Sequence, residues 1–157
     1  MGVDGQTNVR IAVGSDESTP LTGFVADELG KRGHEVVRTG ALAPGDDPRW
    51  PAVGAQVGAT VASGRCEQGI LFCYTGTGVS MAANKVAGVR AALCQDAETA
   101  AGARRWNDAN VLVMSLRSTS TQEAHEMLDA WFSAPSGDAE DAEMVRILDA
   151  MDGTAAG

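Results

Sequence analysis

The chain has 157 residues in ordinary globular proportions, 44% hydrophobic and 21% charged, which argues for one folded soluble domain and against a disordered or fibrous class. Twelve Lys and Arg against 21 Asp and Glu give a net charge of -9, and an acidic surface repels phosphate backbones and anionic lipid headgroups. We therefore expect partners among neither nucleic acids nor membranes.

The N-terminal segment, residues 1–8, has neither the basic start nor the apolar run of a secretory signal. No stretch of the chain approaches the roughly 18 apolar residues that cross a bilayer. We expect this segment to be disordered or flexible and the protein to be cytoplasmic.

Short apolar runs alternate with longer helical patterns between residues 9 and 134, which is typical of βα units around a parallel sheet. The third run, Gly69–Cys73, is apolar throughout, as expected for a central strand covered on both faces. The sequence thus predicts one α/β domain whose five strands are residues 9–13, 34–38, 69–73, 89–93 and 111–114.

Helical patterns fill the connections between these strands. Pro20 suits a first helical turn, and apolar residues then recur at helical spacing as far as Leu29. Residues 43–48 are rich in Pro, Gly and Asp and predict a loop. The predicted helices are residues 20–29, 50–62, 81–86, 98–105 and 122–132.

Residues 135–157 form a separate C-terminal segment, in which a short Pro-Ser-Gly linker leads into an acidic helix over residues 138–151 and a tail. A five-stranded sandwich leaves no obvious place for the apolar face of this helix, so packing on a partner subunit is one expectation. Its acidic residues either form a solvated face or enter a neighbouring subunit's site. The apolar face carries Met144, Ile147, Leu148 and Met151.

Polar residues follow the first, third and fifth strands, at the edge where open parallel sheets bind ligands. The Thr75–Gly78 loop can present backbone N–H groups to an anion, although a turn that needs only small residues explains the same composition. Met81 stands where a dinucleotide fingerprint needs glycine, and the Gly-Lys-Ser/Thr of a P-loop is missing, so no cofactor is expected. The three polar groups are residues 15–19, 73–78 and 115–118.

The three cysteines lack a C-x-x-C pair, which indicates neither a disulfide framework nor a thiolate metal site. Cys66 and Cys94 are expected to be small buried apolar residues. Cys73 differs because it precedes the glycine loop, where N–H donors and a helix N-terminus lower a thiol pKa and favour a base or nucleophile. Arg117 is either an anion clamp or a solvated surface residue.

Four motifs in the second half of the domain can be read together. They are Cys73–Gly78, Ala82–Lys85, Gly88–Cys94 and Asn107–Leu112. In combination they resemble the ribose-5-phosphate isomerase B and galactose-6-phosphate isomerase family, over about Arg10 to Phe132. The resemblance implies a Rossmann-like three-layer α-β-α sandwich with a five-stranded parallel sheet. It also implies a homodimer or homotetramer with the site at the subunit interface.

Members of that family interconvert aldose and ketose phosphates by moving a proton between adjacent carbons through a cis-enediolate. This chemistry needs a base, donors for the developing oxyanion and a group that opens the sugar ring. The resemblance implies that Cys73 is the base and that Thr75 assists it. It further implies an enediolate hole from the N–H groups of Gly76, Thr77 and Gly78, and substrate contacts from Asp16, Asn107 and Arg117.

The chain also departs from the family pattern. Glu17 stands where most members have a histidine that contacts substrate, and Trp106 stands where they have the ring-opening histidine. Tyr74 replaces a glycine and is expected to narrow the pocket. Glu17, Tyr74 and Trp106 are all predicted to contact the substrate. The C-terminal basic cluster is missing apart from Arg146. These changes favour a different sugar phosphate, or an unphosphorylated or linear sugar such as a four-carbon one.

The sequence therefore predicts an aldose-ketose isomerase with Cys73 as base, with no metal and with a small sugar or sugar phosphate as partner. The alternative is a sugar-binding protein derived from the isomerase fold that has lost catalysis, which Trp106 and the missing basic cluster favour. A cysteine-nucleophile hydrolase fits less well, because no histidine in these motifs accompanies Cys73.

Overall fold

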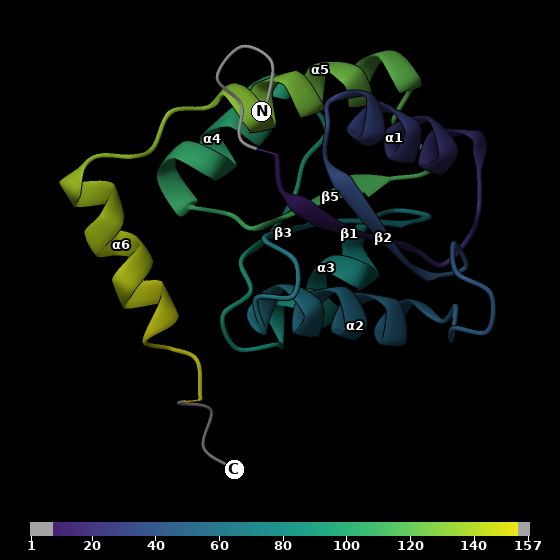
Figure 1. Cartoon of the computed structure of the whole chain (residues 1–157). Helices are drawn as coiled ribbons and strands as arrows, with labels where there is room; N and C mark the ends of the chain where they lie inside the picture. Colours follow the sequence, from purple (N-terminus) through teal and green to yellow (C-terminus); the bar gives the residue numbers. More distant parts are fainter. Residues whose placement is uncertain (1–7, 154–157) are drawn as a thin grey trace.

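A five-stranded parallel sheet lies between two layers of helices in the computed structural model, which describes residues 8–153 (Figure 1). The strand order is β2-β1-β3-β5-β4. The predicted flexible segment 1–8 lies outside the described residues apart from Asn8, as does the end of the C-terminal tail. The elements are β1 (Arg10–Ser15), α1 (Pro20–Lys31), β2 (Glu35–Gly40), α2 (Trp50–Ala62), β3 (Gln68–Cys73), α3 (Thr77–Asn84), β4 (Ala91–Leu93), α4 (Ala97–Asn107), β5 (Val111–Ser115), α5 (Thr121–Ser133) and α6 (Ala139–Asp149).

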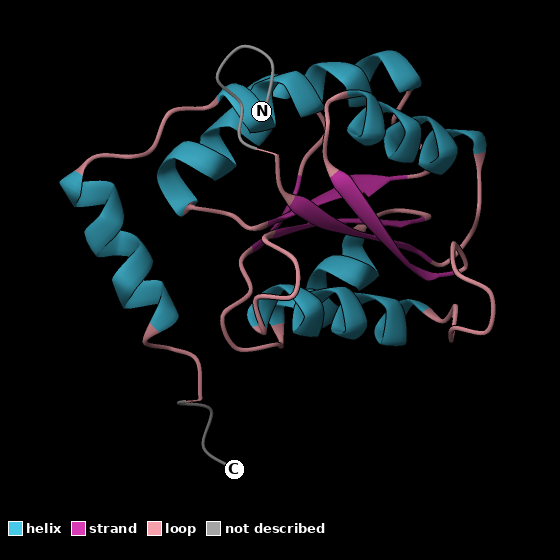
Figure 2. Cartoon of the chain, viewed as in Figure 1, coloured by secondary structure: helices cyan, strands magenta, loops and turns pink. Residues whose placement is uncertain are grey.

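Both faces of the sheet are buried, which explains the continuous apolar runs of the strands. Along β3, Ile70 and Phe72 pack in the core under α1, α4 and α5, whereas Leu71 and Cys73 pack in the core under α2 and α3. This alternation follows from the two-residue period of a strand. Figure 2 shows the resulting helix, sheet and helix layers, so the predicted three-layer α/β sandwich is confirmed.

Two element boundaries differ from the sequence prediction. Helix α3 begins at Thr77 rather than Met81, because Gly76 adopts a left-handed conformation (φ 82°) that starts the helix directly after the loop. Strand β4 contains only Ala91–Leu93 rather than 89–93. Before it, the Arg90 N–H donates at 2.8 Å to the side-chain oxygen of Asn110 rather than to a backbone carbonyl, so the pairing with β5 begins only at Ala91.

His34 was predicted to begin the second strand, but it lies one residue before β2 and is buried in the turn after α1. Its Nδ1 accepts the Val9 N–H at 3.2 Å, and its ring stacks on Phe132 with centroids 4.5 Å apart. His34 therefore has a structural role in the α1 to β2 turn.

Helix α6 lies beside the sandwich rather than in either layer, and none of its residues is buried (Figures 1 and 2). Met144, Ile147, Leu148 and Met151 all keep 45% or more of their surface exposed. The expectation that this face packs on a partner subunit stays a prediction. No helix in the described part of the chain combines the length and apolar character that crossing a membrane requires.

Candidate active site

The carboxyl ends of β1, β3 and β5 lie side by side and bring three predicted polar groups to one edge of the sheet. Ser15 pairs with Phe72, and Cys73 pairs with Ser115, so Asp16 and Cys73 leave adjacent strands together. The chain runs from β1 to β2 on one side, whereas β3 lies on the other side of β1. A change of direction of this kind opens a crevice outside the strand ends, where ligands of open α/β sheets bind.

Cys73 is 5% exposed and packs in the core with residues of α2 and α3. Its carbonyl accepts the Leu116 N–H at 2.9 Å, and the Tyr74 carbonyl accepts the Arg117 N–H at 3.0 Å. The Ser115 hydroxyl also donates to the Tyr74 carbonyl at 3.0 Å. These bonds extend the pairing of β3 and β5 beyond the strand ends and hold the backbone of the predicted base in place.

The glycine loop after Cys73 has one conformation for both steric and dihedral reasons. A Cβ at Gly76 would lie 2.5 Å from Leu93 Cδ1, and the φ of 82° is disfavoured for any other residue. The first hydrogen bond of α3 runs from the Ser80 N–H to the Gly76 carbonyl, and no side chain caps the helix. The N–H groups of Thr77 and Gly78 thus precede the helical ladder and are placed to bind an anion.

The Thr75 and Thr77 hydroxyls lie 2.8 Å apart at this helix start. Both residues are exposed, so the hydroxyl pair is open to a ligand. The pair can pass a proton as well as donate to an oxygen, because each hydroxyl is both donor and acceptor.

Asp16 carries a buried side-chain oxygen, Oδ1, that has no hydrogen-bond partner among the described residues. Burial raises the pKa of Asp16 above its usual value, the neighbouring Glu17 charge raises it further, and a backbone hydrogen bond partly opposes both effects. The turn is fixed by Ser15, whose hydroxyl donates to the Glu17 carbonyl at 2.6 Å and accepts the Glu17 N–H at 3.2 Å. An unpartnered buried carboxyl oxygen costs free energy unless a ligand donor reaches it.

Tyr74 and Arg117, which follow the ends of β3 and β5, lie together. Tyr74 is 63% exposed, and the Arg117 guanidinium carbon is 5.8 Å from the centre of its ring. Nine predicted residues therefore gather at this edge, namely Asp16, Glu17, Cys73, Tyr74, Thr75, Gly76, Thr77, Gly78 and Arg117.

Trp106 and Asn107 do not join this group within the chain. They end α4 and lead into the start of β5, so they lie at the amino edge of the sheet. Strand β5 has 5 residues, which span roughly 16 Å at about 3.3 Å per residue. A small sugar at Cys73 is too short to reach either residue of the same chain. Their predicted substrate contacts stay predictions that need a second subunit.

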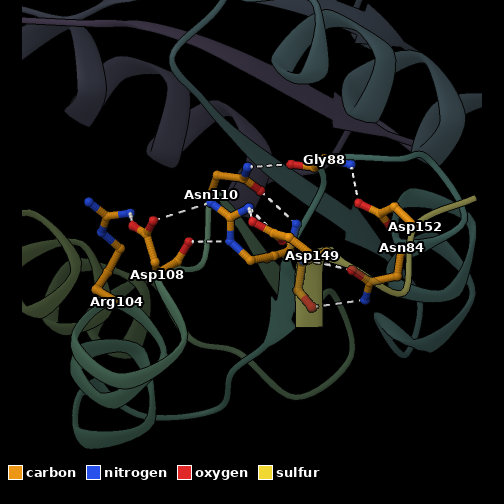
Figure 3. A network of polar contacts seen from close by, with 9 residues as sticks. Asn84, Gly88, Arg104, Asp108, Asn110, Asp149 and Asp152 are labelled. Atoms are coloured by element: carbon orange, nitrogen blue, oxygen red, sulfur yellow. Dashed lines mark hydrogen bonds and ion pairs between the residues drawn. The ribbon is translucent and has the colours of Figure 1, made fainter. Parts of the chain in front are cut away.

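A polar network at the amino edge surrounds the position after Asn107 (Figure 3). Asp108 has a left-handed backbone (φ 46°), and its carboxylate lies 3.3 Å from Arg90 and 3.7 Å from Arg104. Arg90 also pairs with Asp149 of α6 at 3.1 Å, and Asp152 accepts the Gly88 N–H at 2.7 Å. The network fastens α6 to its own chain.

A second wall of the crevice was missed by the sequence analysis, which treated residues 43–48 only as a loop. An open cleft of about 810 Å³ lies between Asp16 and the segment that leads from β2 into α2. Trp50 lies over the start of α3, since a Cβ at Gly78 would be 2.9 Å from its ring. One feature of the sequence could have indicated this wall. The segment follows the carboxyl end of β2, and ligands of open α/β sheets bind outside the carboxyl ends of the strands. The cleft is lined by Asp16, Asp47, Pro48, Arg49, Trp50, Pro51 and Ala52.

The other two cysteines are buried, as predicted. Burial raises the pKa of Cys66, and burial together with the Asp96 charge raises the pKa of Cys94 to about 11. Both therefore remain protonated thiols at neutral pH. Within residues 8–153, no group of three or more His, Cys, Asp or Glu side chains is placed to hold a metal ion.

A parallel five-stranded sheet between two helical layers, with its polar loops at the carboxyl edge, defines a Rossmann-like α/β protein. The chain belongs to the ribose/galactose isomerase family, whose model matches residues 11–148. This confirms the resemblance seen in the sequence, and the prediction that the chain is an isomerase of this type.

Similar proteins include isomerases with different named substrates. The chain is 37% identical to ribose-5-phosphate isomerase B of Escherichia coli over 126 residues, covering 80% of the chain and 84% of the relative. It is 34% identical to D-erythrulose-4-phosphate isomerase of Pectobacterium atrosepticum over 127 residues, with the same coverage. The solved ribose-5-phosphate isomerase B of Clostridium thermocellum superposes with a TM-score of 0.86 at 34% identity, covering 94% of this chain and 99% of that one.

Proposed function

We propose that the chain is an aldose-ketose isomerase that acts on a sugar phosphate through a cis-enediolate, with Cys73 as the base. The observation that carries this proposal is the position of Cys73 at the strand end directly before the uncapped start of α3. A thiolate there lies next to N–H groups that can stabilise the oxyanion formed when a proton leaves carbon.

In the proposed reaction, the Cys73 thiolate takes the proton from the carbon next to the carbonyl, and the electron pair moves onto the carbonyl oxygen. The N–H groups of Thr77 and Gly78 stabilise this oxyanion. The paired hydroxyls of Thr75 and Thr77, 2.8 Å apart, pass a proton between the two substrate oxygens. The Cys73 thiol then returns its proton to the adjacent carbon, so that all atoms balance.

We further propose a short open-chain substrate. A tetrose 4-phosphate cannot close a furanose ring through its blocked fourth oxygen, and so it needs no ring-opening group. Support comes from Trp106, which replaces the histidine of the resemblance, and from the relative that is named D-erythrulose-4-phosphate isomerase.

The complete site is proposed to form between subunits of a homodimer or homotetramer. The support is geometric, because Trp106 and Asn107 lie at the edge opposite Cys73 and α6 leaves an apolar face exposed. The cytoplasmic location stays a prediction.

The test is deuterium exchange. The protein is incubated in D₂O with erythrulose 4-phosphate, ribose 5-phosphate and the corresponding free sugars, and NMR follows deuterium uptake next to the carbonyl. Cys73→Ala should abolish exchange, whereas Cys66→Ala, at another cysteine of the same core layer, should retain it. Undiminished deuterium exchange with Cys73→Ala would contradict the assignment of Cys73 as the base. Saturable binding without exchange by the unmodified protein would favour the non-catalytic binder.

A further inference from the structure

We propose that Arg49 binds the anionic end of the substrate and that Trp50 packs against its carbon chain, so that these two residues set the specificity of the Cys73 site. This inference rests on the proposed isomerase function and extends the site to the cleft between Asp16 and the segment before α2. Neither residue was among the candidate site residues in the sequence.

The charge of the cleft is the first argument. Its lining contains the carboxylates of Asp16 and Asp47, and Glu17 is the next residue in the chain after Asp16. Arg49 is the one cation among the described residues that line it. An anionic substrate would be repelled from this cleft unless Arg49 received it. Arg117 is not among the described residues that line the cleft, and its guanidinium lies over the Tyr74 ring.

The geometry of Arg49 is the second argument. Its Nε lies 2.9 and 3.1 Å from the two Asp47 carboxylate oxygens, and its Nη2 lies 2.6 Å from Oδ2. This pairing orients the guanidinium and occupies only part of its five N–H donors. The Arg49 pair holds the pKa of Asp47 down at about 2, so the carboxylate stays ionised at any pH suitable for an assay. The Arg49 side chain is 81% exposed, and its free donors can form a fork to a phosphate.

Trp50 supplies the third argument. Its ring lies against the first turn of α3, at Gly78, yet 46% of the residue remains exposed. Pro48 and Pro51 on either side restrict the backbone around it. A carbon chain that runs from the enediolate donors of α3 towards Arg49 therefore crosses the tryptophan.

The test compares Arg49→Met with Arg65→Met, a matched change at an exposed arginine in the turn after α2, outside the cleft. Isothermal titration calorimetry measures inorganic phosphate binding, and steady-state kinetics measures kcat and KM for erythrulose 4-phosphate and for erythrulose. Arg49→Met should weaken phosphate binding and raise KM for the phosphate ester by about 10-fold or more, with kcat and the KM for the free sugar little changed. Arg49→Lys should restore part of the affinity, and Arg65→Met should change neither value.

Unchanged phosphate affinity in Arg49→Met, or an unmodified protein that neither binds phosphate nor prefers the ester, would overturn the role of Arg49. If the unmodified protein binds phosphate through Arg49 but exchanges no deuterium, the isomerase assignment fails while the anion site stands. Trp50→Ala should raise KM for ester and free sugar alike, whereas Trp50→Phe should retain most of the affinity. Equal KM values in Trp50→Ala and the unmodified protein would remove the tryptophan from the site.

Discussion

The two edges of the sheet use polar groups in opposite ways. At the carboxyl edge, Asp16 Oδ1 has no partner and the start of α3 has no side-chain cap. At the amino edge, Arg90 contacts both Asp108 and Asp149, and Asn84 exchanges two hydrogen bonds with the Ala91 backbone. The unpartnered oxygen and the uncapped helix start are open to a ligand, whereas the network at the amino edge holds the fold together. An unpartnered atom does not by itself mark a binding edge, because the buried Nε2 of His34, just before β2, also lacks a hydrogen-bond partner among the described residues.

Gly76→Ala should distort the loop at the carboxyl edge and produce the largest effect on stability and activity. The new Cβ would meet Leu93 at 2.5 Å in a left-handed backbone, so we expect destabilisation by about 1–3 kcal/mol and a loss of kcat/KM of about 100-fold or more. The matched control is Gly64→Ala, whose φ is 79° but whose Cβ would meet nothing within 4 Å. It should cost about 1 kcal/mol of backbone strain and leave activity unchanged. Denaturant unfolding and steady-state kinetics measure both, and full activity in Gly76→Ala would contradict a rigid donor loop.

Mixing subunits tests whether the two edges meet across an interface. Cys73→Ala and Asn107→Ala should each be inactive alone. After the two are unfolded and refolded together, a dimer with shared sites should regain about a quarter of the unmodified activity, because half the dimers are mixed and each has one intact site. Assaying the refolded mixture against each variant refolded alone gives the result. No recovery, with dimers shown by light scattering, would mean that Asn107 does not serve the partner's site.

Arg90→Ala should loosen α6 with a smaller effect on stability. The Arg90 side chain is 16% exposed and contacts Asp108 and Asp149, so its loss should cost about 1 kcal/mol. Arg146→Ala is the control, since Arg146 is 67% exposed and pairs with Glu143 of the same helix, and it should have almost no effect. Limited proteolysis of the linker before α6 and denaturant unfolding measure the difference. Equal proteolysis of both variants would show that the network does not fasten the helix.

Asp16→Asn should have the smallest effect on stability, and its sign is informative. Burial raises the pKa of Asp16 in the folded chain, so ionisation disfavours the fold as the pH rises through that pKa. The variant should therefore be more stable than the unmodified protein at pH 7, by less than about 1 kcal/mol because the residue is partly in water, and this gain should vanish in acid. KM should rise at the same time. Thermal unfolding at several pH values checks this, and a gain that persists in acid would contradict the burial argument.

The sheet and much of its carboxyl edge could be predicted because they depend on local patterns. Apolar runs marked the strands, and the residues after Cys73 were specific only in combination with the three other motifs. The start of α3 was placed four residues late at Met81, because the left-handed backbone of Gly76 begins the helix inside the polar loop. Trp50 could not be placed from sequence, since its role comes from packing against Gly78, which lies far along the chain.

The separation of Asn107 from Cys73 shows a different limit of prediction from sequence. A motif match indicates which residues belong to a family's site, but it does not say whether one chain brings them together. The alternation of strands and helices already contains this information, because a helix between parallel strands returns the chain to the opposite edge. The end of α4 therefore lies away from the end of β3.

The strand order also bears on how the protein is made. Strand β4 is synthesised before β5 but pairs only with β5, and the Cys73 and Tyr74 carbonyls receive their hydrogen bonds from Leu116 and Arg117. On the ribosome, β4 has no neighbour and the Cys73 loop has no anchor until β5 has emerged and inserted beside β3. Such late, non-local pairing is slow compared with helix formation. The nascent chain thus carries Cys73, the proposed base, before it holds that residue in its final position.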